Sequence, residues 1–96
     1  MVVIPVFLLA FRRPGEPAVI RPVKVPDEAI GRASSESAIC ELAFKFGQND
    51  FQPLPFRSVS VGDVASLEGR LFIVEVAGFR EISRVEFMTL ESGRAS

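Results

Sequence analysis

The sequence predicts an α+β domain in which one amphipathic helix packs on a curved, mainly antiparallel sheet of four to five strands, followed by a short C-terminal helix. One segment with the 3.6-residue period of a helix lies in the middle of the chain, and apolar or alternating β-branched segments flank it. Ninety-six residues, 48% hydrophobic and 24% charged, are enough for one core. We therefore expect a single globular domain over residues 1–91 and a flexible tail at 92–96.

The first quarter of the chain predicts a β-hairpin. Residues 1–11 are almost entirely apolar and rich in β-branched side chains, which is typical of a buried strand. This stretch is too short to span a bilayer as a helix, and arginines follow it instead of preceding it, unlike a signal peptide, so we expect a cytoplasmic protein. A Pro-Gly turn at 13–17 leads to an alternating strand at 18–25. Because proline cannot donate to a ladder, Pro5 and Pro22 predict edge or bulged positions.

Residues 35–46 contain the clearest helix signal. Ser34 or Ser35 can cap its N-terminus, and Gly47 is expected to close it in the left-handed conformation. The connection at 26–33 has room for one helical turn. Four residues of the helix follow the spacing of one apolar face: Ile39, Leu42, Ala43 and Phe46.

The second half of the chain predicts three further strands, at residues 57–61, 64–67 and 71–76. Glu68-Gly69 forms a two-residue connection between the last two of them. Ser83 and Glu86 have the spacing of a capping box, which predicts a short helix that ends near Leu90.

The composition removes most familiar enzyme mechanisms. There is no histidine, so an imidazole base and a histidine metal ligand are both absent, and the one cysteine, Cys40, is expected to be a buried thiol. No phosphate-binding glycine motif or calcium-binding loop occurs. Eleven basic and twelve acidic residues give a net charge of −1 without a basic stripe. We expect no cofactor, no metal ion and no catalysis.

Residues 56–64 read F-R-S-V-S-V-G-D-V, and they are followed by a hairpin around Gly69 and a closing Gly78-Phe79 with Ile82 beyond it. This pattern, which covers residues 56–82, resembles small YodL-like domains. These are uncharacterised α+β domains found in proteins of plasmids, phages and integrative elements. The resemblance implies an accessory protein of a mobile element and implies no mechanism. V-G-D-V turns also occur in small β-barrels that bind nucleic acids.

The candidate binding residues are polar or aromatic side chains expected on loops and turns: Gln48, Asn49, Asp50, Arg57, Asp63, Phe79 and Arg80. Each has a structural alternative. The loop at 48–50 can simply terminate the helix, Asp63 can cap a turn through its side chain, and the arginines can be solvated surface charges, although Arg57, Arg80 and Arg84 could converge on an anionic partner.

Three functions are compatible with these observations. The leading hypothesis is a non-enzymatic accessory protein that acts through protein–protein contacts, with itself as a homodimer or with another protein, and without a membrane. The alternative is a small nucleic-acid-binding module, favoured by the excess of arginine over lysine. The third is an enzyme without histidine, in which Asp50 or Asp63 is the base and Arg57 or Arg80 an electrostatic clamp.

Overall fold

The computed structural model describes residues 2–12, 16–49 and 57–91. The predicted tail at 92–96 lies outside these residues. Within the described ranges eight elements follow one another: β1 (Val2–Leu8), β2 (Val19–Val25), α1 (Asp27–Arg32), α2 (Glu36–Phe46), β3 (Val64–Leu67), β4 (Arg70–Glu75), β5 (Gly78–Ile82) and α3 (Arg84–Glu91).

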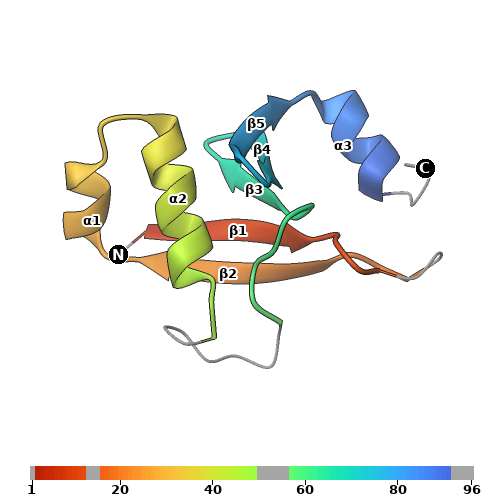
Figure 1. The fold of residues 1–96 in the computed structure, drawn as a ribbon, viewed down its shortest axis with the longest axis horizontal. Coiled ribbons are helices and arrows are strands. Elements are labelled where there is room, and N and C mark those ends of the chain that lie inside the picture. The colour runs from red at the N-terminus through yellow and green to blue at the C-terminus, as the bar shows by residue number, and fades with distance from the viewer. Residues whose placement is uncertain (1, 13–15, 50–56, 92–96) are drawn as a thin grey trace.

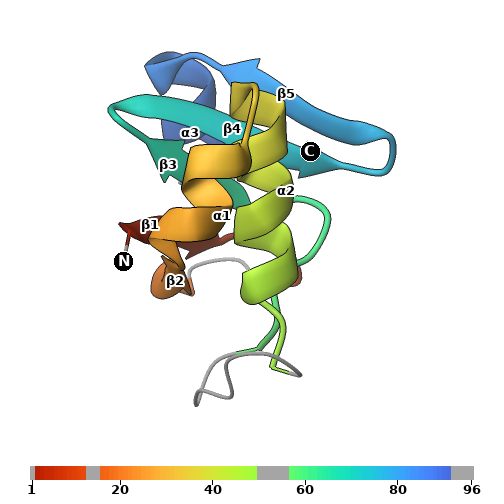
Figure 2. The same ribbon diagram turned by 90° about the vertical axis from the view of Figure 1, so that its left-hand side faces the viewer.

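The five strands form one antiparallel sheet in the order β2-β1-β3-β4-β5 (Figure 1). Helices α1 and α2 lie on one face of this sheet, and α3 lies on the opposite face, beside β3, β4 and β5 (Figure 2). Helix α2 contacts both outer strands, β2 and β5, because the sheet curves around it. The predicted fold class is therefore confirmed.

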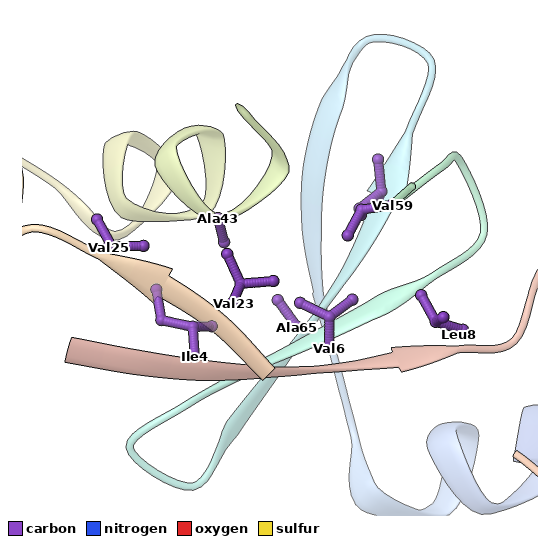
Figure 3. Close-up of a cluster of buried hydrophobic side chains, with 9 residues drawn as sticks. Ile4, Val6, Leu8, Val23, Val25, Ala43, Val59 and Ala65 are labelled. Atoms are coloured by element: carbon purple, nitrogen blue, oxygen red, sulfur yellow. The ribbon is translucent and has the colours of Figure 1, made fainter. Parts of the chain in front are cut away.

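The hydrophobic core has two parts, one on each face of the sheet. Alternate residues of β1 serve both parts because successive side chains of a strand point to opposite faces. The part under α2 consists of Ile4, Val6, Leu8, Val23, Val25, Ala43, Val59, Ala65 and Val74 (Figure 3). The part under α3 contains Val64, Ile82 and Phe87, and here the rings of Phe7 and Phe87 meet edge to face at 4.8 Å.

The predicted strand at 57–61 is wrong. Residues 57–60 follow an irregular path, and the fifth strand is β5 instead. The backbone of this segment bonds to loops and side chains: the Val59 amide donates to the Gly47 carbonyl, and the Ser60 amide donates to the Asp63 carboxylate. These bonds replace the ladder that a neighbouring strand would have supplied.

The two prolines of the hairpin lie opposite each other. Pro22 lies in the edge strand β2, as expected, but Pro5 lies in β1, which has neighbours on both sides and pairs with β2 without a bulge. The prediction of an edge or bulged position is therefore wrong for Pro5. Pairing of β1 with β3 begins one residue later, at Val6, so the missing N–H of Pro5 breaks no bond of that ladder.

The ends of the helices agree with the capping predictions, except at Gly47. The Ser35 hydroxyl accepts from the Ala38 amide, and the Ser83 hydroxyl accepts from the Glu86 amide. Gly47 has φ −80°, which is not the left-handed conformation. Glycine is required there by close packing instead, because an added Cβ would lie 2.4 Å from Val59 Cγ2.

The turn between β3 and β4 has the predicted form. Glu68 and Gly69 both have positive φ, at 49° and 83°, which is typical of a two-residue hairpin turn that matches the twist of the strands. Across the described parts of the chain, no helix combines the length and the apolar character that a membrane crossing requires.

Candidate functional site

Asp63 is fully buried at the centre of a polar network. Its two carboxylate oxygens accept hydrogen bonds from both terminal nitrogens of Arg57, at 2.5 and 2.7 Å. They also accept from the Ala10 amide at 2.9 Å and from the Ser60 amide at 2.8 Å. A carboxylate has about four lone-pair positions, and these donors occupy all of them.

Arg57 connects two parts of the chain, its own loop and the end of β1. Besides Asp63, its terminal nitrogens donate to the carbonyl of Ala10, just after β1, and to the carbonyl of Ser58 in its own loop. The network therefore holds the loop at 57–63 against the end of β1. The role of the network is structural, since the charge of Arg57 neutralises the buried carboxylate of Asp63.

Arg21 is a fully buried cation, and it holds the other end of this loop. Its side chain donates to the Asn49 side-chain oxygen and to the Arg57 carbonyl, each at 2.9 Å. Burial lowers the pKa of Arg21. The sequence analysis assigns no role to Arg21. The alternation of β2 could have indicated its burial, because it places Arg21 on the same face of the strand as Val23 and Val25.

The loop after α2 also bonds within the protein. The Gln48 side-chain amide donates to the carbonyls of Phe44 and Val59, both at 2.9 Å. The Asn49 backbone amide donates to the Ser58 hydroxyl. Asp50, the third predicted residue of this loop, lies outside the described residues. The hydrogen bonds of Gln48 and Asn49 agree with a loop that terminates α2, which was the structural alternative to a binding loop.

Phe79 lies in a different environment, an apolar groove between α2 and the β4–β5 hairpin. The groove has a volume of about 270 Å³. Val76, at the tip of the hairpin, is 93% exposed, and Val61 on the opposite side is also exposed. The side chains that line it come from three regions of the sequence: Glu41, Phe44, Val61, Val74, Glu75, Val76, Gly78 and Phe79.

The charges around β5 are mostly paired. Arg80 contacts Glu86 at 3.1 Å and Glu75 at 3.0 Å, and these hydrogen bonds raise its pKa. On the other face of the strand, Arg70 contacts Glu81 and Glu36. The hydrogen bond from Arg70 lowers the pKa of Glu81.

Glu41 differs from these acids. It lies on the α2 wall of the groove and is exposed, and it forms no ion pair within the described residues. The groove therefore combines an apolar floor with one unneutralised negative charge at its rim.

Among the residues that the structure describes, the other reactive groups do not assemble into a centre. Cys40 is buried in α2, and burial together with the charge of Glu36 raises the pKa of its thiol to about 11. Arg57 and Arg80 have separate acidic partners and do not converge. In residues 2–12, 16–49 and 57–91 no three acidic or cysteine side chains lie close enough together to hold a metal ion.

Comparisons with models of protein families, with curated proteins and with solved structures returned no match. The site is therefore defined by its geometry alone. Sequence reasoning included Phe79 among the candidates but missed Glu41 and Phe44, because only the packing of α2 across the sheet brings them to Phe79.

Proposed function

We propose that this protein is a non-enzymatic accessory protein that binds a partner protein in the groove between α2 and the β4–β5 hairpin. The observation that supports it is the contrast between two sets of residues. Among the described residues, the polar side chains that could carry chemistry bond to one another or to the backbone, whereas the concave surface at Phe79 is apolar and open.

This contrast argues against the enzymatic alternative. A general base must accept a proton from its substrate, and Asp63 has every acceptor position filled and no exposed surface. The terminal nitrogens of Arg57, the electrostatic clamp of that alternative, donate hydrogen bonds to Asp63 and to backbone carbonyls. Asp63 therefore has no free acceptor to offer a substrate.

The biological setting remains part of the proposal. A buried, unpaired thiol such as Cys40 fits a reducing compartment, so we place the protein in the cytoplasm. The YodL-like resemblance points to a mobile element. The part of the resembling segment that the structure describes, residues 57–82, supplies Val61 and Phe79 to the groove.

The test is capture of partners from a host cell with two matched variants. Val76→Asp places a charge at the lip of the groove, and Val85→Asp places the same charge on the exposed side of α3, where Val85 is 74% exposed. The proposal expects a stoichiometric partner that the wild type and Val85→Asp retain and Val76→Asp loses. If Val76→Asp retains every partner, the groove is not the binding surface.

Nucleic-acid binding is a second candidate, and one observation favours it. The ring of Phe11 is largely exposed and lies 5.5 Å from the Arg57 guanidinium, beside a pocket of about 320 Å³ that Arg12 also lines. An exposed ring of this kind can stack on a base. We rank it second because Asp63 neutralises Arg57. A salt-dependent affinity for single-stranded oligonucleotides that Phe11→Ala abolishes would move it to first place.

A further inference from the structure

The two edges of the sheet differ in their ability to pair with another strand. In an antiparallel pair, residues alternate between positions that bond to the neighbouring strand and positions that face away from it. Pro5 lies opposite Pro22, and neither has an N–H, so this pair is of the type that does not exchange hydrogen bonds. The backbone of Pro22 therefore faces outward, and its missing donor interrupts the β2 edge.

The β5 edge has no such interruption. Val76 and Ala77 form a two-residue turn between Glu75 and Gly78, so Gly78 occupies a position that bonds to β4. Because bonded positions recur at every second residue, Arg80 also forms its backbone hydrogen bonds with β4. The N–H and C=O groups of Phe79 and Glu81 face away from β4, and within the described residues β5 is the last strand of the sheet.

The groove meets this open edge at Phe79, and the rest of its lining comes from α2, from β4 and the β4–β5 turn, and from Val61. Phe79 belongs to both, since its backbone faces outward along the edge while its side chain lines the groove. Helix α2 forms the opposite wall with Phe44 and Glu41. A strand added to β5 would therefore reach the groove at Phe79.

We propose that β5 accepts an extended peptide segment of the partner protein as an additional strand. The inference rests on the proposed function, since it specifies how the same groove binds. Residues directly opposite on neighbouring strands share a face of the sheet, so the peptide residue opposite Phe79 points toward the groove. That residue is apolar, since the floor is formed by Val74, Phe79 and Phe44.

The charge at the rim selects the flanking residues of the peptide. Glu75 and Glu81 already have arginine partners, but Glu41 has none within the described residues. A lysine or arginine next to the apolar residue can reach Glu41, whereas an acidic residue would be repelled. The expected ligand is an extended segment of alternating apolar and basic residues.

The experiment selects binders for the wild-type protein from a displayed library of random eight-residue peptides and measures the affinity of the best peptide for three variants. Glu81→Pro removes an outward N–H without removing a bond to β4, and Glu81→Gln removes only the charge. Ile20→Pro makes the matched change on the β2 edge, where the same alternation turns Ile20 outward. Unfolding curves of all variants establish that they are folded.

The proposal expects peptides with alternating apolar and basic residues, and an affinity that falls about fivefold or more for Glu81→Pro and stays unchanged for Ile20→Pro and Glu81→Gln. Bound peptide should also slow hydrogen exchange at the amides of Phe79 and Glu81. If Glu81→Pro binds as tightly as the wild type, or these amides are not protected, strand addition is wrong.

Two further outcomes also overturn the inference. A library that yields no binder removes the peptide as the occupant, and so does a concentration-dependent dimer that Glu81→Pro dissociates, because the edge is then filled by a second copy. Neither outcome decides the proposed function, which depends on whether Val76→Asp loses its captured partner.

Discussion

Arg57 and Asp63, six positions apart in the chain, are joined side by side through two hydrogen bonds of 2.7 and 2.5 Å. Asp63 is fully buried and Arg57 is partly exposed. The same guanidinium donates to the Ala10 carbonyl, and the same carboxylate accepts from the Ala10 amide. The pair therefore fixes the loop at 57–63 to the end of β1 and explains why this segment is not a strand.

Removal of the arginine should destabilise the protein strongly. In Arg57→Met the Asp63 carboxylate keeps its backbone donors but loses its cation, and a buried charge left in this way costs about 3 kcal/mol or more. Urea unfolding at pH 7 measures the loss. Arg84→Met is the control, because Arg84 is exposed on the first turn of α3. Equal stability of the two variants would show that the pair contributes nothing.

Replacement by alanine should have opposite effects on stability at Gly47, which follows α2, and at Gly31, which lies within α1. In Gly47→Ala the new Cβ would lie 2.4 Å from Val59 Cγ2 and 2.8 Å from the Ala43 carbonyl oxygen, and overpacking of this kind costs about 1–3 kcal/mol. Gly31, in α1, has open space around it, so Gly31→Ala should stabilise by about 0.5–1 kcal/mol.

Thermal unfolding of the two variants measures whether Gly47→Ala destabilises the protein and Gly31→Ala stabilises it. Val59→Ala removes the nearest clashing methyl groups, so in combination with Gly47→Ala it should cost less than the sum of the two single changes. Strict additivity would mean that Val59 is not the residue that requires glycine at position 47.

The pH dependence of stability should report on Cys40. The thiol has an ordinary pKa of 9.0 and a pKa of about 11 in the folded protein. The folded state therefore keeps its proton where the unfolded state loses it. Stability from this group is complete below pH 9 and is lost as pH rises toward about 11, by roughly 2–3 kcal/mol.

The measurement compares the free energy of unfolding of wild type and Cys40→Ala between pH 8 and 11. Tyrosine is absent from the chain and the lysines are common to both proteins, so the difference between the two curves isolates the thiol. Parallel curves would contradict the assignment. A thiol reagent that modifies native Cys40 rapidly at pH 8 would contradict it as well.

The local patterns predicted most of the elements. The periodicity of Ile39, Leu42 and Ala43 identified α2, and the Glu68-Gly69 turn located the β3–β4 hairpin. The error at 57–61 has a physical cause. The alternation of Val59 and Val61 looks like that of a strand, but the bonds that decide the path come from Arg21, Gly47 and Ala10, which are distant in sequence.

The candidate site was less accessible to sequence reasoning for the same reason. Phe79 belongs to the closing Gly78-Phe79 of the pattern that resembles YodL-like domains, and it lines the groove. Glu41 and Phe44 read as ordinary helix residues, since nothing in the sequence states that α2 crosses the sheet to reach β5. The sequence offers Asp63 either as a turn cap or as a catalytic base. In the structure it is fully buried and bonded to Arg57 and to two backbone amides.

The central claim is that a partner protein occupies the groove beside Phe79, and site-specific photocrosslinking tests it most directly. A photoreactive amino acid replaces Val76 at the lip of the groove, and in a second protein it replaces Val85 on α3; both positions are exposed, so the fold tolerates the change. After irradiation in the host cell, the account predicts one defined crosslinked protein from position 76, with the contact in an extended segment, and none from position 85. Crosslinking to the same protein from both positions, or from position 85 alone, would contradict it.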